Sequence, residues 1–186
     1  MRLETSRTIL RRFEKKDLED LNEYCSQDGV GEMAGWKHHI NLLTSKEVLC
    51  RNIQNQNIFA IENKENRKVI GYIAINSDSE NGREDTKELG FVLNHNYQNQ
   101  GIMTEVIYHI LDYIFSKDIE YVYACCFQNN MPSKRLIEKC GFTYEQEGSF
   151  YAESLNKSFK SFEYVYSKMI GSYRININKF QFKVEQ

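Results

Sequence analysis

Residues 88–127 read ELGFVLNHNYQNQGIMTEVIYHILDYIFSKDIEYVYACCF, and this stretch decides the fold. Its first part, Glu88–Leu93, is a β-rich run, and Tyr121–Phe127 at its end is another. Between them, apolar residues recur on one stripe of Gly101–Phe115, which is the period of an amphipathic helix. A strand, a helix and a strand at this spacing form a βαβ unit, so we expect the two strands to run parallel.

The loop of this unit, Tyr97–Glu105, is polar and contains one glycine, Gly101. A strand, a short glycine-containing loop and a helix start point several backbone N–H groups at one place, which suits a phosphate or pyrophosphate. Neither the Walker pattern nor the three glycines of the Rossmann pattern is present. On its own, one glycine in a polar loop is more often the start of an ordinary helix.

A second polar helix start follows the second strand, in residues 130–142 (NMPSKRLIEKCGF). We expect a short helix over Pro132–Cys140 that ends at Gly141, because glycine adopts the left-handed conformation of a helix end most easily. Both helix starts follow the carboxyl ends of neighbouring parallel strands, where open α/β sheets bind ligands. Together they predict a cleft with a ligand site.

Five more elements are expected before this unit, and two more follow the short helix after it. Those before it are a strand (Thr8–Phe13), a helix (Lys16–Gln27), a second helix that a capping box opens (Thr44–Glu47), and two strands of an antiparallel meander (Asn57–Glu62 and Val69–Ile75). Those after it are strands over Thr143–Glu147 and Phe159–Ser167. We therefore expect one α/β domain over residues 1–170. The tail, residues 171–186, is expected to form either an added edge strand or a homodimer contact.

Composition argues against several classes of function. The chain has 186 residues, of which 41% are hydrophobic and 13% aromatic, enough for a folded core. Its net charge is -2 and both signs are interspersed, so we expect no nucleic-acid partner. No apolar run approaches the ~20 residues of a membrane helix, and residues 1–17 do not resemble a signal peptide. We therefore expect a cytoplasmic protein with no membrane partner.

Cysteine and histidine do not indicate a metal site. The five cysteines contain no C-x-x-C pair, which argues against a zinc site and against a disulfide framework. Cys125 and Cys126 lie in one predicted strand and should point to opposite faces. We interpret the close histidine pair, His38 and His39, as bare surface residues. No metal is predicted.

The two helix starts resemble those of the GNAT superfamily of acyl-CoA-dependent N-acetyltransferases, and within it the ribosomal-protein N-terminal acetyltransferase-like (Rim-type) branch. The first matches Q-x-x-G-x-M at Gln98–Met103, and the second matches N-x-x-S-x-x-L-x-E-K-x-G-F at Asn130–Phe142. The strand Glu88–Leu93 (E-x-G-x-x-L) and the segment Ile70–Ile73 (I-G-Y-I) match in the family's order. Each motif is weak alone, but the ordered set is specific and covers about residues 5–168.

The resemblance implies a mixed, mostly antiparallel sheet flanked by helices and splayed open between the two parallel strands, with acetyl-CoA as co-substrate in the gap. On the family's pattern, the pyrophosphate is held by the backbone amides of Gln98, Asn99, Gln100, Gly101, Ile102, Met103 and Thr104. The backbone of Phe91, Val92 and Leu93 pairs with the pantetheine arm, and Asn130 hydrogen-bonds to it. Two departures leave the affinity open: Met103 replaces a more usual alanine or glycine, and Gln98-Asn99 replaces the Trp-Gly common in this branch.

Acetyl transfer to an amine needs a neutral nucleophile and a hydrogen-bond donor for the departing thiolate. Glu88 is our candidate for the general base, and the alternative is a carboxylate that only orients the substrate. Ser133 is our candidate for the acid beside the cofactor sulfur, and the alternative is a helix cap. Trp36 either lines the acceptor pocket or packs in the core.

The predicted function is direct transfer of an acetyl group from acetyl-CoA to a primary amine, with a protein N-terminal α-amine as the preferred acceptor. A small molecule, such as a polyamine or an aminoglycoside, is the alternative acceptor. A non-catalytic acyl-CoA-binding sensor is the alternative from another class of protein. We expect two loops, Gly29–Asn41 and Gly148–Phe159, to determine the acceptor, which the sequence does not decode.

Overall fold

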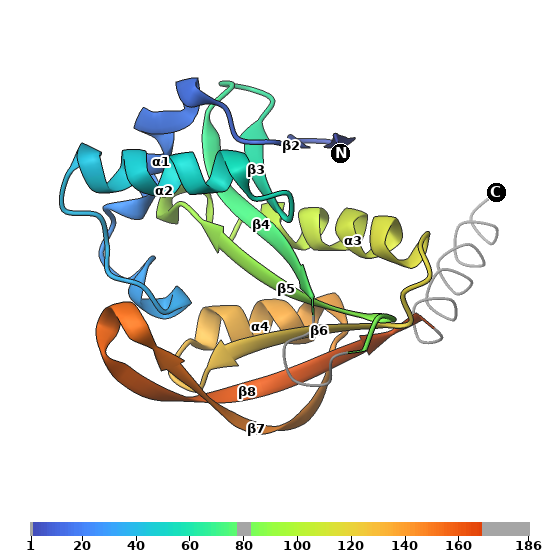
Figure 1. Ribbon diagram of the computed structural model, residues 1–186. Coiled ribbons are helices and arrows are strands. Elements are labelled where there is room, and N and C mark those ends of the chain that lie inside the picture. The colour runs from blue at the N-terminus through green and yellow to red at the C-terminus, as the bar shows by residue number, and fades with distance from the viewer. Residues whose placement is uncertain (1, 78–82, 169–186) are drawn as a thin grey trace.

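The computed structural model describes residues 2–77 and 83–168, and these residues form an eight-stranded sheet with helices on both faces (Figure 1). The strands lie in the order β1-β2-β3-β4-β5-β6-β8-β7. Their bounds are Leu3–Glu4 (β1), Thr8–Arg11 (β2), Ile58–Asn63 (β3), Val69–Ser77 (β4), Thr86–Leu93 (β5), Tyr121–Phe127 (β6), Thr143–Ala152 (β7) and Lys157–Ser167 (β8). Among the described strands, only β5 and β6 pair in parallel, so the predicted mixed, mostly antiparallel sheet is confirmed.

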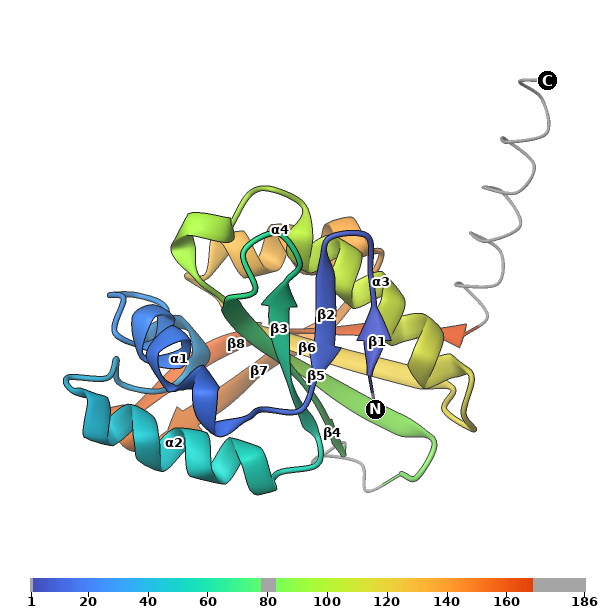
Figure 2. The ribbon, with the colours of Figure 1, turned by 90° about the horizontal axis from the view of Figure 1, so that it is seen from above.

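Four α-helices of the described residues cover this sheet in two pairs. Helices α1 (Leu18–Cys25) and α2 (Leu42–Gln54) lie on one face, and α3 (Ile102–Phe115) and α4 (Met131–Cys140) lie on the other (Figure 2). Short 3-10 turns precede or connect these elements: η1 (Lys15–Asp17), η2 (Glu32–Ala34), η3 (His95–Tyr97) and η4 (Glu153–Leu155). Within the described residues, no helix is long and apolar enough to cross a membrane.

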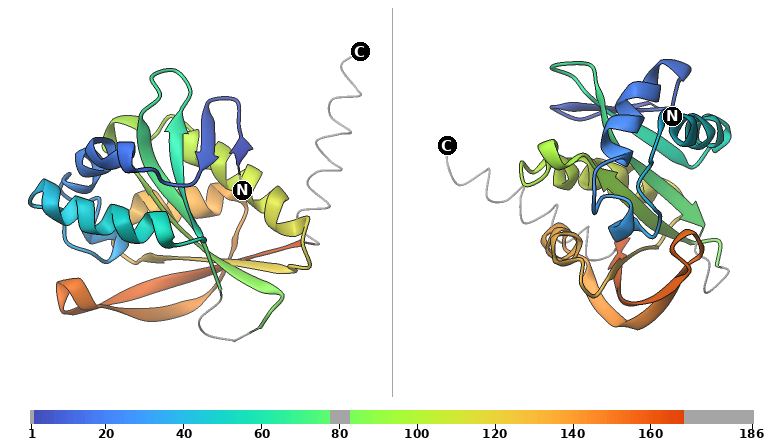
Figure 3. Two further views of the ribbon diagram at one scale, coloured as in Figure 1. Left: turned by 45° about the horizontal axis from the view of Figure 1, so that its top comes forward. Right: turned by 90° about the vertical axis from the view of Figure 1, so that its left-hand side faces the viewer.

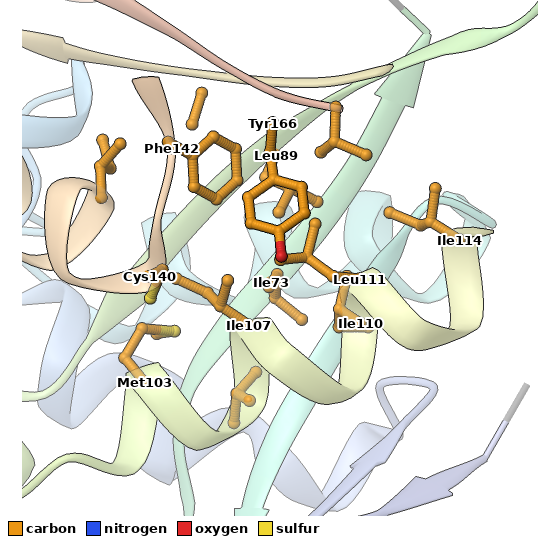
Figure 4. Close-up of a cluster of buried hydrophobic side chains, with 14 of the residues drawn as sticks. Ile73, Leu89, Met103, Ile107, Ile110, Leu111, Ile114, Cys140, Phe142 and Tyr166 are labelled. Carbon is orange, nitrogen blue, oxygen red and sulfur yellow. The ribbon is translucent and has the colours of Figure 1, made fainter. Parts of the chain in front are cut away.

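The larger core lies between the sheet and helices α3 and α4. The predicted stripe of α3 is buried there, and Ile107 and Ile110 pack toward Ile73 and Leu89 of the sheet (Figure 4). Full burial of such a side chain contributes about 1.5–3 kcal/mol, so this stripe fixes α3 firmly against the strands. Helices α1 and α2 lie against the other face of the sheet (Figure 3), and a smaller core of buried side chains joins them to it. The helix start that follows β5 is therefore held in one place.

Helix α2 begins earlier than the sequence predicted. Its first residue is Leu42, and the side-chain oxygen of the N-cap residue Asn41 accepts a hydrogen bond from the backbone N–H of Thr44 (2.9 Å). The predicted capping box at Thr44–Glu47 is therefore wrong, because these residues lie inside the helix. Leu42 and Leu43 are both exposed, so no apolar period marks the true start.

The C-terminal strands are longer than predicted. β7 continues to Ala152 instead of ending at Glu147, and β8 begins at Lys157 instead of Phe159. The predicted acceptor loop Gly148–Phe159 is therefore mostly a β-hairpin with a short turn. Most of β7 is exposed to solvent, so its apolar residues do not alternate in a way that marks its length.

Smaller differences concern the N-terminal half. β2 ends at Arg11 rather than Phe13, and the first predicted helix is divided into η1 and α1. His39 is buried, with its Nδ1 atom 2.8 Å from the Ser45 hydroxyl, so the interpretation of His39 as a bare surface residue is wrong. Cys126 is buried and Cys125 exposed, as their opposite orientation predicted. The tail, with its predicted edge strand or homodimer contact, lies outside the described residues.

Candidate active site

The sheet opens beside its parallel pair of strands. β5 and β6 pair only over Thr86–Leu89 and Tyr121–Ala124. Beyond that point β5 continues along β4 while β6 continues along β8, and the two strands diverge (Figure 1). The predicted splay is therefore confirmed. Among the described residues, the β5 segment Gly90–Leu93 has no strand on its open side, where its backbone can bind a ligand as an added strand would.

A cavity of about 510 Å³ occupies this region. Its walls come from β5, the loop before α3, the start of α4 and the segment around η2: Gly29, Val30, Met33, Ala34, Phe91, Val92, Leu93, His95, Tyr97, Gln98, Asn99, Gly101, Ile102, Met103, Thr104, Asn130, Pro132, Ser133, Arg135, Leu136 and Lys139. The lining includes the cations Arg135 and Lys139, and no Asp or Glu from the part of the chain that the structure describes. Such a lining favours an anionic ligand.

The loop before α3 presents backbone amides at this cavity. Asn99 and Gly101 have positive φ angles of 59° and 74°, and Gly101 is the N-cap residue of α3 without a side-chain cap. The next three amides, those of Ile102, Met103 and Thr104, donate to no group within the described ranges. Free first-turn amides and the positive end of the helix dipole are features that favour an anionic ligand.

Side chains of the same loop fix its backbone. The Gln98 amide donates to the Leu93 carbonyl (2.9 Å), and the Gln100 amide donates to the Asn96 carbonyl (2.8 Å). Asn94 is buried, and its side-chain oxygen accepts from the Asn96 N–H (3.0 Å). Gln100 is the one predicted cofactor residue of this loop that does not line the cavity. Its side chain stabilises the loop through the hydrogen bond to Asn96.

At the start of α4, Asn130 and Ser133 differ in their contacts. The Asn130 side-chain oxygen accepts from the Ser133 N–H (3.2 Å), and its amide donates to the Met33 carbonyl (3.2 Å). Asn130 is therefore the N-cap residue, and it ties α4 to the segment around η2. The Ser133 side chain lines the cavity, and its hydroxyl has no hydrogen-bond partner in the described part of the chain. Helix capping therefore does not account for the hydroxyl.

Glu88 and Trp36 are outside the cavity lining. Glu88 is half-buried on β5 where the strands begin to diverge, and the Cys125 thiol donates to its carboxylate (3.5 Å). Although Cys125 reaches solvent, desolvation by surrounding protein together with Glu88 raises the pKa of its thiol to about 12, so it is not a thiolate at pH 7. Trp36 packs against the smaller core, with its ring centroid 5.3 Å from that of His39.

The splayed sheet and the amide-lined loop agree with the comparison to known sequences. The family profile described as "Acetyltransferase (GNAT) domain" matches residues 7–143. The chain belongs to the GNAT acetyltransferase family. It is 30% identical over 151 residues to YnaD, an uncharacterized N-acetyltransferase of Bacillus subtilis (strain 168), and the match covers 81% of this chain and 86% of YnaD.

Solved structures of GNAT proteins have the same fold. A GNAT-family acetyltransferase from Bacillus anthracis is 25% identical, with a TM-score of 0.78 over 90% of this chain and 98% of that one. The microcin C7 self-immunity acetyltransferase MccE, solved with acetyl-CoA and AMP, is 24% identical, with a TM-score of 0.73 over 87% of this chain and 93% of MccE. The protein is thus an acetyl-CoA-dependent acyltransferase with the GNAT fold.

Three cations near the site of this GNAT enzyme were not predicted from its sequence. Arg135 and Lys139 are four residues apart on α4 and both line the cavity. This spacing places both on one helix face, so it was a usable signal. Arg7 donates from Nη1 to the Gln100 carbonyl (2.8 Å) across more than 90 positions of sequence. Only the folded chain shows that contact.

Proposed function

We propose that this GNAT enzyme acetylates the α-amine at the N-terminus of a protein, with acetyl-CoA as the donor. The donor side of the proposal is supported by the cavity chemistry. The residues proposed to hold the pyrophosphate through their amides are Gln98–Thr104, called the phosphate loop below. Arg135 and Lys139 add positive charge to the same cavity. The open edge of β5 at Phe91–Leu93, with Asn130 opposite, is proposed to hold the pantetheine arm.

The observation that carries the acceptor side is a contact between two chain segments. The Ser154 hydroxyl, in the turn between β7 and β8, donates to the Gly35 carbonyl beside η2 (3.1 Å). The Phe150 ring also packs on Gly35, where a Cβ atom would lie 2.9 Å from it. These contacts join the turn between β7 and β8 to Gly35, the residue that follows Ala34 of the cavity lining. We propose that the acceptor passes beside this contact, which an amine at the end of a flexible chain can do more easily than a lysine on a folded surface.

The chemistry of the amine points the same way. Deprotonation at pH 7 costs about 1 kcal/mol for an α-amine with pKa ~7.8, but about 4.6 kcal/mol for a lysine with pKa ~10.4. An α-amine therefore needs only modest help from a base. Glu88 is proposed to receive that proton, directly or through a water molecule.

Ser133 is proposed to assist the leaving group. The amine nitrogen forms the new C–N bond as the C–S bond breaks, and negative charge collects on sulfur. A hydroxyl without a competing partner can donate a hydrogen bond to that charge as it develops. The Cys125 thiol stays protonated and is therefore a poor nucleophile. The acetyl group is proposed to pass directly from acetyl-CoA to the amine, without an acyl-cysteine intermediate. The proposed location is the cytoplasm, where free thiols such as its five cysteines stay reduced.

The test is release of free CoA thiol from acetyl-CoA with a matched set of acceptors. One peptide has a free N-terminus and no lysine, and a second has a blocked N-terminus and one internal lysine. A polyamine and an aminoglycoside complete the set. We expect the highest kcat/KM with the first peptide. Turnover only with the polyamine or the aminoglycoside would show that the acceptor is a small molecule and not a protein. Acetyl-CoA binding without any turnover would indicate a sensor.

A further inference from the structure

The turn between β1 and β2 contacts the phosphate loop from outside the cavity. Figure 2 shows β1 and β2 beside α3. The Ser6 hydroxyl and the Arg7 backbone N–H donate to Oε1 of Glu105 (2.8 and 3.0 Å), and Arg7 Nε donates to Oε2 (2.8 Å). Arg7 Nη1 donates to the Gln100 carbonyl (2.8 Å). One arginine therefore joins the loop backbone to a carboxylate in the first turn of α3.

The negative charge of the Glu105 carboxylate lies close to the proposed pyrophosphate site. Glu105 follows directly on the three free amides of α3, about one helical turn from the helix start. Burial would raise the pKa of Glu105, but hydrogen bonds from Thr5, Ser6 and Arg7 outweigh it and lower the pKa to about 2. The group is therefore charged at every working pH. Without a counter-charge it would repel a pyrophosphate bound at the same helix end.

Arg7 is held in place to supply that counter-charge. Its backbone carbonyl accepts from the N–H of Lys64 (2.9 Å), and the neighbouring Thr5 carbonyl accepts from Lys64 Nζ (2.7 Å). The guanidinium also borders the loop itself, since a Cβ atom at Gly101 would lie 3.6 Å from Nη2. Although the Arg7 side chain is 45% exposed, contacts on both its ends fix it.

We propose that Arg7 is a positioning residue for acetyl-CoA, which neutralises Glu105 and anchors the Gln100 carbonyl so that the loop amides can receive the pyrophosphate. This inference rests on the proposed function of the phosphate loop. It concerns the donor alone and is independent of the identity of the acceptor. Arg7 acts through Gln100 and Glu105, so its loss should weaken donor binding without altering the chemical step.

The experiment compares three variants by calorimetry with acetyl-CoA. Arg7→Met removes the cation, and Arg7→Met combined with Glu105→Gln also removes the charge that the cation neutralises. Arg2→Met is the matched control, because Arg2 forms an exposed pair with Glu4 in the same N-terminal region. S-acetylpantetheine, which has no pyrophosphate, serves as a second donor in thiol-release assays. Thermal unfolding of each variant shows whether it is folded.

We expect Arg7→Met to bind acetyl-CoA roughly tenfold to a hundredfold more weakly, as for the loss of hydrogen bonds to a charged group, with kcat unchanged. Its kcat/KM with S-acetylpantetheine should equal that of Arg2→Met. The double variant should recover part of the lost affinity, because it removes the Glu105 charge but does not restore the hydrogen bond to the Gln100 carbonyl.

An equal loss with both donors, no loss relative to Arg2→Met, or no recovery in the double variant would each overturn the inference. These outcomes leave acetyl-CoA binding by the parent enzyme intact. Failure of the parent itself to bind acetyl-CoA would instead refute the proposed function, and the inference with it.

Discussion

The Ser133 hydroxyl lies in the cleft with no hydrogen-bond partner in residues 2–77 and 83–168, while Asn130 caps the helix. We therefore predict that Ser133→Ala lowers kcat by on the order of 10²-fold, because a donor to sulfur matters most as negative charge develops. The affinity for acetyl-CoA should change much less. Steady-state kinetics together with calorimetry measure both quantities. The control is Ser116→Ala, at the far end of α3, and an unchanged rate in Ser133→Ala would assign the serine no part in catalysis.

Glu88 lies where β5 and β6 begin to diverge, outside the cavity lining. If it is the base, Glu88→Gln keeps the size of the side chain but removes the proton acceptor. We predict a loss of kcat/KM that shrinks as pH rises toward the pKa of the acceptor amine, because solvent then supplies the neutral amine. A pH profile between pH 6 and 9 checks this. The same loss at every pH, with weaker acceptor binding, would mean that Glu88 orients the substrate.

Among the secondary-structure elements, β2, η1 and β3 are joined by a buried ion group. Arg11 donates from Nη1 and Nη2 to Asp17 (2.8 Å each) and from Nε to Glu62 (2.5 Å), and all three side chains are nearly inaccessible. Asp17, against the opposing effect of burial, raises the pKa of the Arg11 guanidinium above its ordinary value. The group thus holds the start of the first helix to strands β2 and β3.

We predict that Arg11→Met lowers the free energy of unfolding by about 3–5 kcal/mol, since it leaves two buried carboxylates without their shared cation. Urea denaturation followed by circular dichroism measures the change. The exposed Arg83–Asp85 pair provides the comparison, and Arg83→Met should lower the free energy of unfolding much less, because solvent screens an exposed pair. Equal effects of the two substitutions would show that burial of the Arg11 group contributes nothing.

The elements differ in how far their sequences define them. Helix α3 could be predicted from its apolar stripe, and that stripe is buried against the sheet. The start of α2 could not, because Asn41 and Thr44 are both acceptable caps and the leucines between them are exposed. The length of β7 could not either, because a mostly exposed edge strand has no apolar alternation. The bounds of an element cannot be predicted from the sequence where its end residues are exposed, because no apolar period then marks the end.

For the whole molecule, the same distinction separates the donor side of the site from the acceptor side. The features proposed to bind the donor could be predicted because each is local: a loop, a glycine and a helix start within a few positions. The proposed acceptor side is assembled from distant segments, such as Gly35 against Ser154. Arg7 likewise reaches the phosphate loop only through the pairing of β1 and β2 at the sheet edge. Such contacts cannot be predicted from the spacing of residues along the chain.

The central claim is that the gap between β5 and β6 is the acetyl-CoA site, with Gly101 at its phosphate loop. Gly101→Glu places a negative side chain at a position with φ 74°, where the backbone approaches the proposed pyrophosphate. Gln54→Glu adds the same charge at the exposed end of α2 and serves as the control. Thermal unfolding of both variants confirms that they are folded.

The most direct measurement is isothermal titration of acetyl-CoA into the parent enzyme and these two variants. The parent and Gln54→Glu should bind with the same dissociation constant, whereas Gly101→Glu should lose at least about tenfold in affinity, equivalent to 1.4 kcal/mol or more. Folded Gly101→Glu that binds acetyl-CoA as tightly as the parent would contradict the account, because the donor would then bind elsewhere on the molecule.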